Sequence, residues 1–296
     1  MISLLGIVLA VGAALCFSLF DLLRKQLTGR LNDASLVTIL ALGASPLYAV
    51  WTVLQPPAEV SVAYAWPAAS AIACNLGANF GFLRSVRLSG LSAVVPLLSL
   101  TPVFTSLLAI PLLGELPDAR AWLGIAMVVL GALALQLGRR GDKDRRRSWR
   151  ANAGTWWMIL VAFLWAAALP LDKLAVAASN AAFHGLVTHI GVGLCMMALA
   201  LRGLRQAPLT GRREREGSGA RTWTLLLTGV VVGAAALGLQ LLALQHAWVG
   251  FVDTVKRGIG SALALVLGRV FFAEPLTGRK VLAVAAIVAG MTVMLW

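Results

Sequence analysis

Ten apolar stretches, separated by short segments rich in charged residues, proline or glycine, divide the chain. A helix needs about 20 apolar residues to cross the hydrocarbon core of a bilayer, and its backbone must satisfy its own hydrogen bonds there. The sequence therefore predicts an all-α membrane protein with ten transmembrane helices. We place these helices at residues 2–23, 34–54, 64–83, 90–113, 119–137, 153–174, 183–201, 222–245, 249–271 and 279–296.

Charged residues are scarce in this chain and are concentrated between the apolar stretches. Of 296 residues, 59% are hydrophobic and 12% are charged, against roughly 45–50% and 25% in a globular domain. The basic residues behind the net charge of +13 lie mostly in residues 138–150 and 202–221, which flank predicted helices. Since loops rich in Lys and Arg stay in the cytoplasm, these residues indicate topology and argue against a nucleic-acid partner.

The same basic residues orient the chain. Odd-numbered loops carry most of the Lys and Arg, so we expect these loops on the cytoplasmic side and both termini outside. A composition rich in alanine, with more arginine than lysine, favours a bacterial inner membrane as the location. The lipid bilayer is therefore the first expected partner.

The two halves of the chain repeat each other. Residues 6–25 align with residues 154–173 without a gap, and GELPDARAWLGIAMVVLGALAL aligns with AEPLTGRKVLAVAAIVAGMTVM, which places Glu115 on Glu274. Because each unit has five helices, an odd number, the second unit enters the membrane in the opposite sense and forms an inverted repeat. The expected division is a first repeat at 1–138, a basic cytoplasmic linker at 139–152 and a second repeat at 153–296.

Two motifs, LSLTPVFTSLLAIPLLGE and VLGRVFFAEPLTG, resemble the EamA-like drug/metabolite transporter superfamily. The resemblance covers nearly the whole chain and implies a basket of ten helices that carries small organic solutes. In the ninth helix, GFVDTVKRGIGSALALVLGRVFF is similar to the segment of plastid sugar-phosphate translocators in which adjacent Lys and Arg residues, here Lys256 and Arg257, hold the phosphate. The fourth helix lacks the basic residue that would supply a second phosphate ligand, so an anion is favoured over a sugar phosphate specifically.

The charges of the ninth helix demand compensation. Lys256 lies about seven residues, or roughly 10 Å, inside its span, and each charged side chain at a helix centre costs about 2.5–3.5 kcal/mol. Asp253 is one helical turn from both Lys256 and Arg257, so it neutralises one of them and leaves one positive charge. We expect these residues to bind an anion; the alternative is a purely structural ion-pair network.

Further polar residues in the predicted helices are candidates for the same site. Lys173, after Asp172 in the sixth helix, would meet the other end of an anionic substrate, or would anchor the helix at the interface. Amides at Asn75, Asn79 and Gln240 would orient a polar solute, or would join helices by hydrogen bonds. Phe17 and Trp165 align across the repeat and would wall a cavity.

Proton coupling has weaker support in the sequence. Glu115 and Glu274 each precede a proline near a helix start, which favours a role in the turn over a role in proton transfer. His184 and His189 are candidate proton carriers, although hydrogen bonding is the commoner role. No ATP-binding GxxxxGK[ST] motif is present, so a gradient of a counter-ion or proton, or an exchanged solute, would supply the energy.

No cofactor or metal site is expected, since the three cysteines lie singly in apolar stretches and no HExxH or GxSxG motif is present. The sequence thus favours a secondary transporter of a small organic anion, with or without a phosphate group, over an enzyme. One alternative is an exporter of amino acids or hydrophobic drugs in which the charges of the ninth helix are structural. Another is a flippase for an anionic lipid headgroup.

Overall fold

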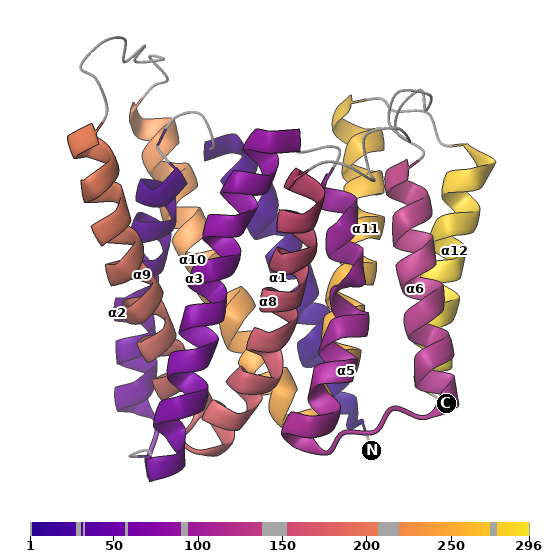
Figure 1. Cartoon of the computed structure of the whole chain (residues 1–296), viewed down its shortest axis with the longest axis horizontal. Coiled ribbons are helices and arrows are strands. Elements are labelled where there is room, and N and C mark those ends of the chain that lie inside the picture. Colours follow the sequence, from indigo (N-terminus) through magenta and orange to yellow (C-terminus); the bar gives the residue numbers. More distant parts are fainter. Residues whose placement is uncertain are drawn as a thin grey trace.

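The computed structural model describes residues 2–27, 31, 33–56, 59–89, 94–137, 153–206, 219–272 and 277–295. These residues form ten α-helices that lie side by side as a bundle (Figure 1), which confirms the predicted all-α fold. The helices are α1 (Leu4–Leu27), α2 (Asp33–Leu54), α3 (Ala65–Ser89), α5 (Thr101–Leu113), α6 (Ala119–Leu137), α8 (Ala153–Ala177), α9 (Ala181–Gln206), α10 (Gly219–His246), α11 (Val249–Phe272) and α12 (Gly278–Val293).

Among the described residues, five helices are long and apolar enough to cross a membrane by themselves: those within α1, α2, α8, α9 and α10. α5 and α6 are apolar but shorter. α11 carries three charged side chains in its first half, and α3 carries two amides, so each is less apolar than an ordinary span. Both of these less apolar helices carry candidate site residues.

The packing of the helices follows the inverted repeat. Exchange of the two halves converts α1 into α8, α2 into α9, α3 into α10, α5 into α11 and α6 into α12. The most extensive contacts join α3 to α8, α1 to α10, α6 to α12 and α2 to α9, and this set is unchanged by the exchange. The chain ends of α1 and α12 lie at the same face of the bundle (Figure 1), as an even number of spans requires.

The fourth predicted helix, 90–113, differs from the expectation of one continuous helix. Residues 90–93 lie outside the described part, Val95–Leu100 form a 3₁₀ helix, and only Thr101–Leu113 are α-helical. Pro96 and Pro102 stand in the first turns of the two segments. Because proline has no backbone N–H to donate to the preceding turn, the helix changes its winding at Thr101.

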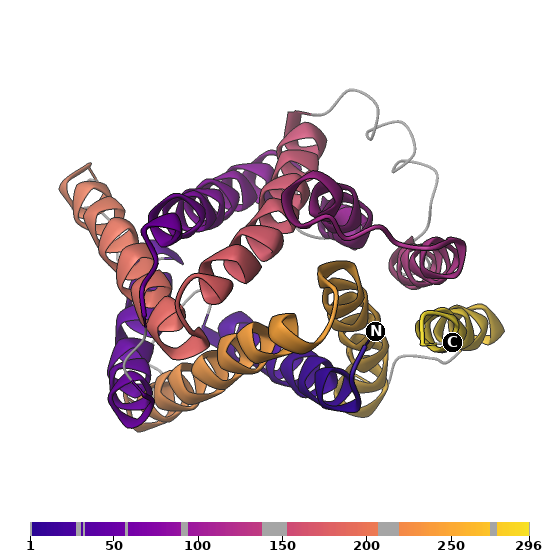
Figure 2. The ribbon, with the colours of Figure 1, turned by 90° about the horizontal axis from the view of Figure 1, so that it is seen from below.

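Small residues bring α6 and α12 into close contact at one edge of the bundle (Figure 2). A Cβ atom on Gly131 would lie 2.8 Å from the Ala283 carbonyl oxygen, and one on Gly290 would lie 2.7 Å from the Gly124 carbonyl oxygen. The repeat alignment relates these two contacts. Without a hydrophobic force between helices in lipid, close approach of this kind supplies the association energy.

We expect Gly290→Ala to lower stability by about 1–3 kcal/mol, because the added methyl group would overpack the contact with α6. The measurement is the melting temperature of the purified protein in detergent. Gly12→Ala is the matched control, since its Cβ would meet only the flexible end of Leu239, at 3.4 Å. Equal melting temperatures for the two variants would contradict this account of the α6–α12 contact.

Candidate functional site

Lys256 and Arg257 lie on α11 with one carboxylate between them. The Asp253 side chain is 1% exposed, and its Oδ1 is 3.4 Å from Lys256 Nζ and 3.9 Å from Arg257 Nε. These three charges stand one helical turn apart on a single helix, as the sequence predicts. One positive charge within this group is not neutralised by Asp253.

Two threonines of α5 hold the opposite side of this cluster. Thr105 Oγ1 donates to Asp253 Oδ2 at 3.0 Å, and Arg257 Nε donates to Thr101 Oγ1 at 2.8 Å. Thr101 stands where the 3₁₀ segment becomes α-helical, so the break in the helix positions a ligand of Arg257. These hydroxyls were not predicted from the sequence, although their i, i+4 spacing in LSLTPVFTSLL places them on one helix face.

Lys256 is fixed by one amide and one aromatic ring. Its Nζ donates to Gln240 Oε1 of α10 at 2.9 Å and lies 5.2 Å from the centroid of the Phe17 ring of α1. Gln240 and Phe17 were both predicted to be near the site. These partners hold the ammonium group without cancelling its charge, because the amide is neutral and the ring contributes only a cation–π attraction.

Arg257 keeps donors available for a ligand. A guanidinium group has five N–H donors in a planar fork that matches carboxylate and phosphate oxygens. Of the three guanidinium nitrogens of Arg257, only Nε has a hydrogen-bond acceptor within the described part of the chain. The side chain is 24% exposed and that of Lys256 is 16% exposed, so both cations are accessible in a way that Asp253 is not.

Lys173 lies away from this cluster, at the face of the bundle that carries the termini. Its Nζ donates to Glu115 Oε1 at 2.6 Å and to the Ala247 carbonyl oxygen at 2.8 Å. The second oxygen of Glu115 accepts the Val249 N–H at 2.7 Å. The carboxylate therefore caps the positive end of α11. Through its ion pair with Lys173 it also links that end to α8.

The turn after α5 brings Glu115 to this position. Gly114 has φ 68°, a left-handed conformation that glycine adopts without steric cost. The sequence favoured a helix-start role for Glu115, and the carboxylate does serve a helix start, but that of α11. The first turn of α6 is capped instead by Asp118 Oδ1, which accepts the Ala121 N–H at 2.7 Å. Glu274 lies outside the described residues.

Asp172 belongs to a second buried network at the same face. His184 Nε2 lies 3.1 Å from Asp172 Oδ1, and His184 Nδ1 lies 3.2 Å from the Tyr64 hydroxyl. His184 is 0% exposed and both ring nitrogens are occupied. His189 bonds the Gly185 carbonyl oxygen of its own helix at 2.8 Å. Both histidines therefore have the hydrogen-bonding role that the sequence analysis gave as the commoner one.

The remaining candidates have partners other than the α11 cations among the described residues. Asn75 Nδ2 donates to the Ala71 carbonyl oxygen and Asn79 Nδ2 to the Asn75 carbonyl oxygen, so each amide nitrogen bonds its own helix. Trp165 packs on Phe82, with ring centroids 5.8 Å apart, in an apolar cluster. The structure thus brings Gln240, but neither asparagine, to the α11 cations.

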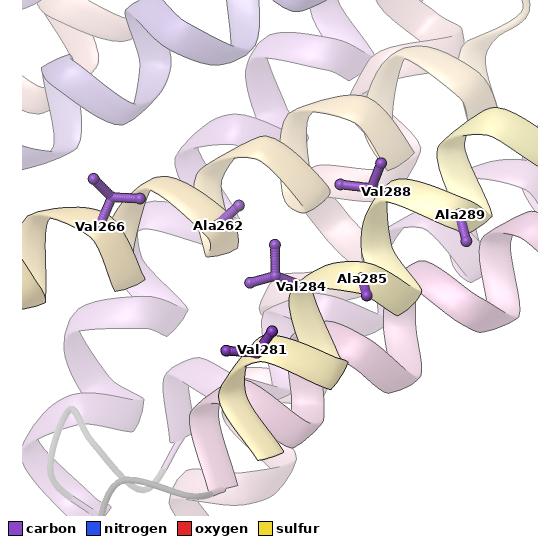
Figure 3. A pocket seen from close by; sticks show the side chains of 7 residues that line it. All are labelled: Ala262, Val266, Val281, Val284, Ala285, Val288 and Ala289. Carbon is purple, nitrogen blue, oxygen red and sulfur yellow. The ribbon is translucent and has the colours of Figure 1, made fainter. Parts of the chain in front are cut away.

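An apolar groove of about 580 Å³ lies between α11 and α12 (Figure 3). Alanine and valine side chains form its whole lining: Ala262, Val266, Val281, Val284, Ala285, Val288 and Ala289. Gly258, one turn before Ala262 on this side of α11, faces Ile287 of α12. A lining without a polar group has no means to recognise an anion, so the groove is separate from the cation cluster.

Comparison with known proteins places these features in context. The model of the EamA-like transporter family matches residues 4–136 and 152–296. A solved structure titled "Crystal structure of protein" is similar to this chain with a TM-score of 0.75 at 18% identity, over 97% of this chain and 95% of that one. At that identity the likeness concerns the fold alone. No curated protein matches the chain.

We expect Asp253→Asn to lower stability by about 3–5 kcal/mol, since removal of one partner from a buried ion pair leaves the other charge uncompensated. The melting temperature in detergent measures this loss. Asp253→Asn/Lys256→Gln should regain part of it, because that pair of changes also removes one of the two stranded cations. Glu59→Gln, an exposed neutralisation, is the control; a loss no larger than that of the control would contradict the ion-pair description.

Proposed function

The chain belongs to the EamA-like transporter family, whose members move small molecules across membranes, and from this premise we propose that it carries a small organic anion by alternating access. The observation that supports this proposal is the charge of the α11 cluster. Two accessible cations share one buried carboxylate, and their hydrogen-bond and ring partners on other helices among the described residues are neutral. An anion supplies the missing negative charge.

The chemistry of the two cations favours a substrate with a carboxylate or phosphate group. A guanidinium fork binds two oxygens of such a group side by side, while an ammonium group binds as a point charge. Both side chains are mostly buried, at 16% and 24% exposed, and a charge–charge attraction there is stronger than at a fully exposed surface. The family match covers substrates of many kinds and does not select among them.

Alternating access needs one face closed while the other is open. At the terminal face, Glu115 ties the N-terminus of α11 to Lys173 of α8, and Asp172 ties α8 to His184 of α9. We assign to the Lys173–Glu115 pair the role of a gate at this face. The repeat alignment gives Lys173 and Glu115 the equivalents Lys25 and Glu274 in the opposite orientation.

A flippase for an anionic lipid headgroup is the second candidate, because the groove between α11 and α12 faces the side of the bundle. The groove follows the line of Gly258, Ala262 and Val266 along α11. Lys256 instead reaches toward Phe17 of α1 and Gln240 of α10. A headgroup in the groove would not meet Lys256 directly, which favours a soluble anion.

We further propose the inner membrane of a bacterium as the location, with the basic odd-numbered loops in the cytoplasm. Ten described helices put both termini on the same side of the membrane, and the distribution of basic residues favours the outside for that side. A proton, a counter-ion or an exchanged solute would supply the energy.

We expect organic anions to raise the melting temperature of the purified protein, since a ligand that binds only the folded state stabilises it by mass action. The panel would contain glucose 6-phosphate, citrate, inorganic phosphate, glycine, tetraphenylphosphonium and long-chain phosphatidylglycerol. Stabilisation by the anions should be lost in Lys256→Gln and in Arg257→Gln. Arg221→Gln, an exposed neutralisation at the start of α10, should keep it.

Two outcomes of this panel would count against the proposal. If tetraphenylphosphonium or glycine stabilises the wild type and both α11 variants alike, the α11 charges are structural and the exporter alternative is favoured. If long-chain phosphatidylglycerol stabilises the protein and soluble anions do not, the flippase alternative is favoured.

We expect Glu115→Gln to open the terminal face, because it removes the charge that holds Lys173 and the start of α11. The reporter is a cysteine at Ser106, a buried residue that packs against Gly250 behind the first turn of α11, in a background without native cysteines. Labelling by a membrane-impermeant thiol reagent from that face should become several-fold faster.

Glu274→Gln should have the opposite effect on the same reporter, since the inverted repeat makes Glu274 the equivalent of Glu115. Asp118→Asn, which caps α6 at the terminal face, is the control and should leave labelling unchanged. Equal rates in Glu115→Gln and the control would remove the gate from the mechanism.

A further inference from the structure

Asp21 is an acidic residue in the membrane-spanning part of α1 that has no part in the networks above. Its side chain is 73% exposed, and the ion pair it makes among the described residues is with Arg24, at 4.0 Å. An ionised carboxylate in a transmembrane helix costs several kcal/mol unless it faces water or a partner. The position of Asp21 on the helix decides which of these it faces.

The exposed leucines of α1 show which side of the helix meets lipid. Leu15 and Leu19 are 47% and 45% exposed and stand one turn apart. A helix turns by about 100° per residue, so Asp21 lies about 200° around α1 from Leu19. Asp21 is therefore exposed on the inner side of the helix.

That inner side contains the contacts of α1 with the cation cluster. Phe17, one turn before Asp21 on the same face, carries the Lys256 ammonium group over its ring. Ser18 lies 3.7 Å from the position of a Cβ on Gly260 of α11. The charges of Arg257 and Lys256 both act on the Asp21 carboxylate. Asp21 thus stands one helical turn from the proposed anion site.

The charged groups around Asp21 come from α1 itself and from α11. They are Arg24 on α1, and Lys256 and Arg257 on α11 with the buried Asp253 behind them. α10 also packs along α1, but its described titratable residues stand at its two ends.

On α10, His246 is opposite Gly6 of α1. Arg221 is twelve residues from Gly233, which is opposite Phe20, or about 18 Å along the helix. The electrostatics of Asp21 are therefore set by the α11 cations and Arg24.

We propose that Asp21 couples the binding of the anion to the uptake of one proton. The three cations and two carboxylates of this region leave it with one positive charge, and a proton on an Asp21 oxygen raises that to two. A doubly charged anion such as a phosphate monoester then matches the site. Ionised Asp21 competes with the substrate for Lys256 and Arg257, and protonated Asp21 leaves both cations to the substrate.

This inference rests on the proposed function and determines the energy source for it. The proton comes from the water on the side where the anion enters, binds Asp21 when the anion binds, and leaves to the water on the other side when the anion leaves. One doubly charged anion and one proton then cross together in each transport cycle. The proton gradient would drive the anion in the direction in which protons flow.

The test is calorimetric titration of the full-length protein with inorganic sulfate, whose charge is constant from pH 5.5 to 8. For the wild type we expect the Kd to fall as the pH falls, by up to tenfold per pH unit, because protonation removes the competing carboxylate. Asp21→Asn should bind sulfate with a Kd independent of pH and as low as that of the wild type at pH 5.5. Asp21→Glu and Asp118→Asn should both keep the wild-type dependence.

The outcomes separate this inference from the proposed function. If Asp21→Asn keeps the wild-type pH dependence, or loses sulfate binding while Asp21→Glu retains it without a pH dependence, the coupling role is wrong and the anion site stands. If Lys256→Gln binds sulfate as well as the wild type does, or if the wild type binds none, the anion site is wrong and the inference falls with it.

Discussion

The cost of a charge in hydrocarbon is the constraint on which the α11 region depends. Lys256 and Arg257 are tolerated at this depth because Asp253 neutralises one of them and because Thr101, Gln240 and Phe17 hold the rest of the two side chains. Each of these partners comes from a different helix. The site therefore exists only when α1, α5, α10 and α11 are packed together. The packing of these four helices fixes the positions of the two cations.

The two repeats differ from each other around this site. The packing of α1 on α10 and of α8 on α3 obeys the two-fold relation, and so do the glycine contacts of α6 with α12. Around the cations the relation fails, since the repeat alignment places Leu97 and Leu98 at the positions of Lys256 and Arg257. Those leucines pack with Trp165, the equivalent of Phe17, in an apolar cluster. One half thus supplies the charge and the other supplies hydroxyls and apolar walls.

The sequence predicted the helices and the repeat well because both follow from patterns that the bilayer enforces along the chain. The break at Thr101 was missed, although Pro96 and Pro102 signal it. Lys256, Arg257 and Asp253 were found because their spacing on one helix is visible in sequence. The contacts of Thr105 with Asp253 and of Glu115 with Val249 were not found, since they join residues more than 130 positions apart along the chain. Spacing within one helix holds no information about such pairs.

The position of Lys173 shows what a prediction from charge alone leaves out. A lysine at the end of an apolar helix was expected either to meet the substrate or to reach the interface, and its ion pair with Glu115 in the structure was not predicted. Its neighbour Asp172 makes an independent buried contact with His184. Adjacent residues on a helix point about 100° apart, so α8 ties two different groups of helices at one level of the bundle. A change that breaks either tie frees α8 on one side only, which suits an element that rocks between two packed arrangements better than one that slides as a whole.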